Sequence, residues 1–253
     1  SEAGYSKANR IMLLEEVLNE MEAGKGTWER NPQRYYVTLF GDVKAEGEDA
    51  RWGLSFEGHH LSLNFVCRGG KVVDSTPQFM ATNPAVVKNE TSVTLGKGTA
   101  VLNQEEQLAF KLVNSLDAKQ LKVARIAEEA LGEIRFAGEP QPEVGEPEGI
   151  AYSSLNPDQQ KQLRDLVDLY VQVAPEEVAA ERSQQIESDG WSKVHFAWAG
   201  ALEPGIGHYY RVQGERFLIE FVNTQADPAG NPANHIHCVY RDLSGDFDLP
   251  VAP

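Results

Sequence analysis

The chain has 253 residues, of which 41% are hydrophobic and 24% charged, a composition typical of a folded globular protein. Its formal net charge of −15 repels a phosphate backbone, so nucleic acid is excluded as a partner. No stretch reaches the roughly 20 consecutive apolar residues of a membrane span, and no basic-then-apolar leader opens the chain. We therefore expect no membrane partner.

The first third of the chain predicts a helix followed by strands. Apolar residues recur at helical spacing through residues 8–22, and Gly24 follows as a stop signal. Aromatic and β-branched runs then predict strands, with a tight turn at Glu57-Gly58: Tyr35–Phe40, Arg51–Phe56, His59–Cys67 and Lys71–Val73. Four strands joined by short turns favour an antiparallel sheet.

The middle of the chain is predicted to be helical. Suitable capping residues and first-turn prolines open helices near the following positions: Asn103, Asp117, Asn156-Pro157 and Pro175. Residues 138–149 interrupt these helices with Pro, Gly and Glu, which exclude a helix or a central strand. This segment is predicted to be an acidic surface loop or a hinge between two halves.

The last third returns to strands. These are predicted at Lys193–Trp198, His208–Gln213, Arg216–Val222 and His235–Arg241. The order of elements favours a single α+β domain with mainly antiparallel sheet flanked by helices. A weak similarity between residues 56–66 and 212–222 raises the alternative of two related halves, 1–137 and 150–253, joined through residues 138–149.

A His-x-His pair in the last predicted strand is the clearest chemical signal. Side chains alternate between the two faces of a strand, so His235, His237 and Arg241 share one face while Ile236 and Cys238 share the other. The first face is predicted to be chemical and the second structural.

Other strands place polar residues where apolar ones are expected. His60 and Asn64 share a face in the third strand, and Glu220 interrupts the apolar run Phe217–Phe221. A buried polar group without a partner costs roughly 1–3 kcal/mol, so such residues need a reason. If the strands are neighbours, six side chains converge: His60, Asn64, Glu220, His235, His237 and Arg241.

Three imidazoles, with or without a carboxylate, suit a divalent transition metal such as Zn, Cu, Fe or Ni. The alternative is that the histidines are exposed or satisfied by hydrogen bonds. No C-x-x-C, H-E-x-x-H, G-x-S-x-G or phosphate-binding glycine loop is present. Cys67 and Cys238 are the only cysteines, and either one disulfide or two buried thiols is consistent with their number.

Several motifs together resemble a known family, catalogued as domain of unknown function 3500. The resemblance spans nearly the whole chain and is carried by motifs in the same order: Trp52-Gly53, Gly58–Phe65, His208–Gly214, Phe217–Gln225, Asn234–His237 and Arg241-Asp242. Two segments depart from the family pattern, Pro228–Pro232 and Gly245–Asp248, which puts the loops over the site in doubt. The family supplies no established reaction.

The resemblance implies which residues occupy motif positions: His59, His60, His208, Arg211, Glu220, Asn223, Gln225, His235, His237, Arg241 and Asp242. Members of the family often look exported, so the resemblance implies a periplasmic or secreted location, with a cytoplasmic one left open.

The leading hypothesis is a metal-dependent enzyme, hydrolytic or oxidative, that acts on a small molecule. His60, His235 and His237 are the expected ligands of one Zn, Cu or Fe ion, with Glu220 as a fourth ligand or general base. The remaining candidates are His59, His208 and Arg211 as catalytic residues, and Asn64, Asn223, Gln225, Arg241 and Asp242 around the pocket. The alternatives are a metal-free protein that binds an acidic or sugar-like ligand through the same face, and a metal-free hydrolase that uses Glu220 with His208.

Overall fold

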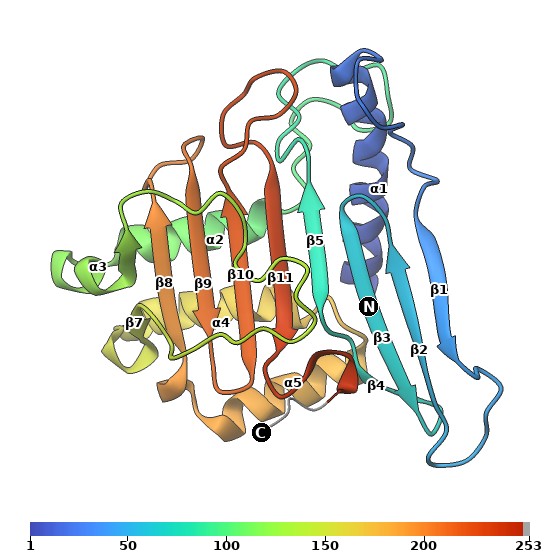
Figure 1. The fold of residues 1–253 in the computed structure, drawn as a ribbon. Helices are drawn as coiled ribbons and strands as arrows, with labels where there is room; N and C mark the ends of the chain where they lie inside the picture. Colours follow the sequence, from blue (N-terminus) through green and yellow to red (C-terminus); the bar gives the residue numbers. More distant parts are fainter. Residues whose placement is uncertain (250–253) are drawn as a thin grey trace.

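The computed structural model describes residues 1–249, in which five α-helices and eleven strands form an α+β fold (Figure 1). The helices are α1 (Glu2–Glu22), α2 (Asn103–Ser115), α3 (Ala118–Ala124), α4 (Pro157–Val171) and α5 (Glu176–Asp189). The strands are β1 (Tyr36–Gly41), β2 (Arg51–Glu57), β3 (Leu61–Arg68), β4 (Lys71–Asp74), β5 (Gln78–Thr82), β6 (Arg125–Ala127), β7 (Ile150–Ala151), β8 (His195–Gly200), β9 (His208–Gln213), β10 (Phe217–Asn223) and β11 (Ile236–Asp242).

All strands belong to one sheet, in the order β1-β2-β3-β5-β11-β10-β9-β8-β6, with β4 beside β3 and β7 beside β8. Every pairing is antiparallel except that of β6 with β8. The predicted α+β class and antiparallel sheet are therefore confirmed. The sheet runs without a break from the N-terminal strands to the C-terminal strands.

Helices cover one face of this sheet, and an irregular segment covers part of the other (Figure 1). On the helical face, Tyr210, Ile219 and Phe221 are fully buried within the main hydrophobic core. On the opposite face Tyr209 and Val222 belong to a smaller buried cluster. The face predicted to be chemical is therefore also largely closed to solvent.

The segment predicted as a surface loop or hinge lies across this second face. We call residues 133–145, which overlap the predicted segment 138–149, the strap. Arg211 donates a hydrogen bond to the Val144 carbonyl at 3.0 Å, and Gln213 donates one to the Gly145 carbonyl at 3.0 Å. Buried polar side chains of the sheet thus hold the strap in place.

Strand β5, which lies between β3 and β11, is not predicted from the sequence. Its five residues stand between Pro77 and Pro84, and prolines so close to a short apolar run argue against a central strand. The prolines flank the strand without interrupting its hydrogen bonds, so β5 joins the N-terminal strands to the C-terminal ones. Elsewhere, predicted ends shift slightly: His59, His60 and His235 precede their strands, and the turn covers residues 58–60.

The helix signals have clear structural counterparts. Asp117 and Asn156 each accept hydrogen bonds from the first turn of α3 and α4, with a glutamine three residues later completing a capping box. Asn103 is instead the first residue of α2, and its side chain caps nothing. None of the helices within residues 1–249 is long and apolar enough to cross a bilayer.

Candidate metal centre

The register of β5 brings the histidines of two distant segments together. Ala81 pairs directly with His237 of β11, and its amide donates a hydrogen bond to the His60 carbonyl at 2.9 Å. Directly opposed residues of an antiparallel pair share a face, and alanine leaves room there for larger rings. In Figure 1 the start of β3, the end of β5 and the start of β11 lie at the same edge of the sheet, and α1 lies close to β5.

Three imidazole rings cluster at this end of the sheet. The ring centroid of His60 lies 5.3 Å from that of His235 and 6.2 Å from that of His237. The centroids of His235 and His237 are 4.6 Å apart. One ring nitrogen from each lies within 4.8 Å of the others. The Nε2 atoms of His235 and His237 are only 3.0 Å apart.

The other nitrogen of each ring faces an oxygen or amide of the protein. The Nδ1 atom of His237 lies 2.7 Å from a Glu133 carboxylate oxygen, and that of His60 lies 3.8 Å from Glu15 Oε1. Metal-binding histidines commonly direct their second nitrogen to a carboxylate, as His237 does. The separation between His60 and Glu15 is too long for a hydrogen bond. With its Nδ1 turned to Glu133, His237 presents its Nε2 to His235.

His235 has an amide in the corresponding place. Its Nδ1 lies 3.4 Å from Asn83 Nδ2, while Asn83 Oδ1 is buried without a hydrogen-bond partner among residues 1–249. The two ends of an amide have nearly the same shape, and exchanging them turns Oδ1 toward the imidazole. In that orientation Asn83 accepts a hydrogen bond from Nδ1–H of His235 and leaves its Nε2 as a lone pair.

His60 carries the least satisfied polar atom of the cluster. Its Nε2 is buried and has no hydrogen-bond partner in the described part of the chain. The side chain is 3% exposed, so bulk water does not compensate. Such an atom costs roughly 1–3 kcal/mol unless a ligand satisfies it.

The surroundings keep two of the rings neutral at physiological pH. Burial lowers the pKa of His60 well below 6.5, and the neighbouring histidines lower it further. Burial also lowers the pKa of His235 to about 4, with His237 adding to the effect. A neutral imidazole has the lone pair that a metal ligand requires.

The carboxylate of Glu133, which is the partner of His237 Nδ1, lies outside the three rings. Burial raises the pKa of Glu133, but the hydrogen bond and charge of His237 outweigh burial and leave the pKa below its usual 4.5. A charged Glu133 accepts a hydrogen bond from Nδ1–H of His237, which fixes the orientation of that ring.

A second group adjoins the first on the side of α1. His59 stacks on His60 with 3.7 Å between ring centroids, and its Nδ1 lies 2.9 Å from Glu15 Oε1. The same oxygen accepts a hydrogen bond from the Tyr35 hydroxyl at 3.0 Å. Glu15 is 3% exposed, whereas the His59 side chain is 38% exposed and lies at the rim. Arg30 Nη1 lies 3.3 Å from each of the two ring nitrogens of His59.

The profile of one family, described as Protein of unknown function (DUF3500), matches residues 1–249. The chain belongs to the DUF3500 family. This confirms the resemblance carried by the motifs. No curated protein and no solved structure matches the chain. The function of this DUF3500 protein therefore has to be inferred from its own side chains.

Glu220 lies on the same sheet face as His237 but outside the group of converging ring nitrogens. Its Oε1 accepts hydrogen bonds from the hydroxyl of Tyr209 and, at 3.2 Å, from the backbone N–H of Arg135. Burial, followed by the charge of Glu220, raises the pKa of Tyr209 above its usual 10. Glu220 thus fastens the strap to the sheet.

His208 lies on the opposite, helical face. It pairs with Asn223 across β9 and β10, whereas Glu220 lies three residues earlier in β10 and faces the other way. The His208 ring stacks on Trp198, and its Nε2 lies 3.2 Å from Glu106 Oε1. Glu220 and His208 therefore do not form the acid–base pair considered from the sequence.

Asn223 connects this helical-side cluster to the segment that carries His235. Its Nδ2 donates a hydrogen bond to Glu106 at 2.7 Å, and its Oδ1 accepts one from the His235 backbone at 3.0 Å. The Gln225 side chain is exposed, but the backbone carbonyl of Gln225 accepts a hydrogen bond from the backbone N–H of Asn234 at 3.0 Å. These residues shape the loop that precedes His235.

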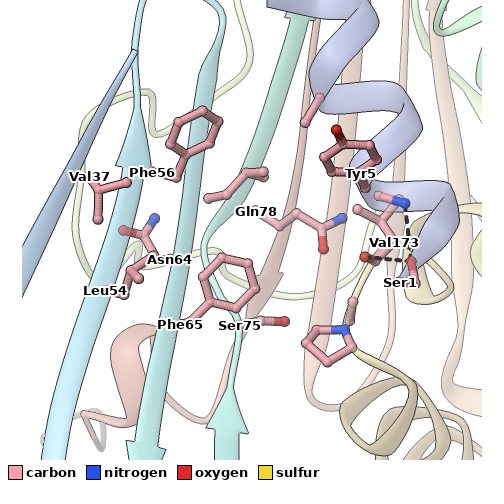
Figure 2. Close-up of a pocket in the computed structure, with 15 residues that line it drawn as sticks. Ser1, Tyr5, Val37, Leu54, Phe56, Asn64, Phe65, Ser75, Gln78 and Val173 are labelled. Atoms are coloured by element: carbon pink, nitrogen blue, oxygen red, sulfur yellow. Dashed lines mark hydrogen bonds between the residues drawn. The ribbon is translucent and has the colours of Figure 1, made fainter. Parts of the chain in front are cut away.

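The other predicted pocket residues have structural contacts. Arg241 donates hydrogen bonds to two strap carbonyls and to Asp246, and Asp242 accepts hydrogen bonds within the turn that follows. Asn64 donates a hydrogen bond to the Pro77 carbonyl at 2.9 Å and borders a separate apolar hollow between α1 and strands β1–β3 (Figure 2). Cys67 and Cys238 are both free and buried, so the disulfide alternative is not realised.

The sequence analysis did not identify Glu15, Asn83 or Glu133. Glu15 could have been found, because it lies four residues after Ile11 and one after Leu14, within the apolar stripe of the first helix. Asn83 follows the missed strand β5, and Glu133 lies in irregular structure. Neither of these two has a periodic signal.

Proposed function

We propose that this DUF3500 protein is a metal-dependent enzyme in which His60, His235 and His237 hold one zinc, copper or iron ion. The observation that carries the proposal is the grouping of one ring nitrogen from each of the three histidines within 4.8 Å, together with a buried His60 Nε2 that has no partner in residues 1–249. Three histidines leave a coordination position for water or substrate, as catalytic metal sites do.

The distances within the cluster support the proposal. Two nitrogens that bind one zinc ion tetrahedrally at about 2.0–2.1 Å lie about 3.3 Å apart. His235 and His237 hold their Nε2 atoms 3.0 Å apart, close to that spacing. The lowered pKa of His60 and His235 supports ligation at neutral pH, since neither proton competes with a metal there.

His59 and Glu15 are the groups we assign to proton transfer. Glu15 accepts a hydrogen bond from the Tyr35 hydroxyl and is hydrogen-bonded to Nδ1 of His59. His59 is the exposed member of this group. A carboxylate that orients an imidazole lets the ring accept a proton from a reacting water or hydroxyl. Glu220 is not assigned this role, because its carboxylate is engaged with Tyr209 and the strap.

The reaction depends on the metal. A bound zinc ion polarises a carbonyl and activates water for hydrolysis, whereas iron or copper supplies oxygen chemistry. The protein contributes orientation of the substrate and a proton acceptor in either case. We therefore propose hydrolysis or oxidation of a small molecule as the reaction class.

Metal analysis of protein purified without a histidine tag tests the proposal. We expect about one equivalent of bound metal, native or after addition of Zn, Fe or Cu salts, and its loss in His60→Ala and His237→Ala. His195→Ala is the matched control, because His195 is a strand histidine outside the cluster. Binding below roughly a tenth of an equivalent of every metal would contradict the proposal.

One observation favours a second candidate, a metal-free binding protein. With Asn83 Nδ2 donating to Nδ1 of His235, the Nε2–H of His235 donates directly to Nε2 of His237. This pair is then satisfied without an ion, and the same face recognises a polar ligand. The metal analysis separates the two candidates.

A further inference from the structure

A cavity of about 440 Å³ opens directly beside the candidate metal centre. Its floor is the face of β11 that carries His237, Val239 and Arg241, and its roof is the first part of the strap, residues 133–140. His237 belongs both to the histidine cluster and to the cavity wall, and its carboxylate partner Glu133 lines the same wall. The cavity therefore starts at the proposed metal and continues along the strand.

Apart from His237 and the charged residues, the lining is mostly apolar: Pro77, Phe79, Ile134, Val239, Pro140 and Phe247. Arg241 lies in the same wall, but Asp246 pairs with its guanidinium at 2.8 Å, so its charge is already compensated. Glu133 and Glu139 are the acidic lining residues. This lining disfavours an anionic group, and a charged group in an apolar cavity is costly to desolvate.

We propose that this cavity receives the apolar chain or ring of an uncharged carbonyl compound, such as an ester or amide, whose carbonyl reaches the metal. This inference rests on the proposed function and specifies its substrate class. The volume lies within the range of about 300–1,000 Å³ that small-molecule sites occupy. Apolar contact along Val239 and Phe79 supplies affinity, and the metal fixes the reacting end.

Alkyl hydroxamates are suitable probes, because the hydroxamate chelates a metal while the chain length is varied. We expect the dissociation constant of the zinc-loaded protein, measured by calorimetry from acetohydroxamate to octanohydroxamate, to fall about fourfold per added methylene, from about 0.8 kcal/mol each. Ala137→Trp, on the exposed strap at the cavity, should abolish this gain and leave acetohydroxamate binding unchanged. Ala226→Trp, on an exposed loop outside the cavity, is the control.

The outcomes distinguish this inference from the proposed function. Zinc-dependent binding of acetohydroxamate without any chain-length effect would overturn the cavity assignment and leave the metal centre standing. A chain-length effect that Ala137→Trp does not change would also overturn it, since the chain then lies elsewhere. If the protein binds no metal, both the inference and the proposed function fail.

A separate observation concerns the outer edge of the sheet. Strand β1 pairs only with β2 within residues 1–249, and its large apolar side chains are exposed: Tyr36 62%, Val37 60%, Leu39 52% and Phe40 55%. The strand contains no charge or proline. Proteins normally protect such an edge with lysine, proline, a bulge or a covering segment.

The sequence of β1 is complementary to itself about Thr38. An antiparallel pairing centred there places Tyr36 opposite Phe40 of the partner subunit, and Val37 opposite Leu39 of the partner subunit. The same register sets Arg34 opposite Asp42 of the partner subunit, so opposite charges meet at both ends. Aromatic, aliphatic, Thr–Thr and opposite-charge pairs each stabilise adjacent antiparallel strands.

We infer that a second copy of this chain covers the β1 edge and extends the sheet through a two-fold axis. Val37 also borders the hollow drawn in Figure 2, so pairing shields one rim of that hollow. The net charge of −15 per chain opposes association, and added salt should strengthen the dimer by screening it.

Sedimentation and cross-linking test the pairing. We expect a salt-strengthened dimer that Thr38→Lys converts to a monomer with an unchanged circular-dichroism spectrum, because two lysines then oppose each other. Thr38→Cys should give a disulfide-linked dimer on oxidation, whereas Val73→Cys, also exposed, should not. A monomer at every salt and protein concentration, or a dimer that Thr38→Lys leaves intact, would overturn the inference.

Discussion

The Nε2 atoms of His235 and His237 lie 3.0 Å apart, and the Nδ1 atom of His237 faces the carboxylate of Glu133. Because a carboxylate only accepts hydrogen bonds, this contact places the proton on Nδ1 and the lone pair on Nε2. The lone pair then points toward His60 and His235. Glu133 thereby sets the chemical character of the cluster without belonging to it.

Replacing Glu133 by glutamine should weaken metal binding while leaving the stoichiometry intact. The amide presents a weaker acceptor to His237, and loss of such an outer partner typically costs tenfold to roughly a hundredfold in metal affinity. Competition with a chromogenic chelator measures the change. Glu129→Gln, an exposed glutamate on the same irregular segment, is the control. Equal affinities for the two variants would remove Glu133 from the account.

Glu220→Gln should leave metal binding unchanged and loosen the strap. The Glu220 carboxylate accepts hydrogen bonds from Tyr209 and from the backbone of Arg135, and an amide replaces these charge-assisted bonds with weaker ones. Limited proteolysis should cleave residues 133–145 faster in the variant than in the parent. A loss of bound metal would instead restore Glu220 as a ligand.

Ile219→Asp should unfold the protein. Ile219 is fully buried in the main hydrophobic core, and an unpaired carboxylate there costs more than about 4 kcal/mol. Ile206→Asp, at a loop position 54% exposed, should change the free energy of unfolding by less than about 0.5 kcal/mol. Urea unfolding followed by circular dichroism compares the two. An Ile219→Asp variant as stable as the parent would invert the assignment of faces.

Asp246 should make stability fall as pH rises from about 4 to about 6. Burial raises its pKa from 3.8 to about 6, although Arg241 pulls the value down. Between these values the folded state binds more protons than the unfolded state, so this contribution is complete below pH 4 and lost above pH 6. Asp246→Asn should flatten the decrease measured by urea unfolding, whereas Asp158→Asn, at an exposed position of α4, should not. Asp74, whose pKa burial also raises, retains part of the slope.

Much of the cluster could be predicted from sequence, because alternation along a strand places His235 and His237 on one face whatever their neighbours are. Their approach to His60 depends on β5, a strand too short and too close to prolines to be predicted. For Glu220 the sequence indicates the unusual environment but not the partners. A carboxylate in an apolar strand correctly indicated a special environment, but its partners come from a strap without periodic pattern.

The most direct test of the central claim is an anomalous-scattering map of crystals grown from tag-free protein with the metal present. We expect one peak about 2.0–2.1 Å from an imidazole nitrogen of each of His60, His235 and His237. The absorption edge of that peak identifies the element. A map without a peak there, with the three rings joined to one another and to Glu15 and Glu133 by hydrogen bonds, would contradict the account.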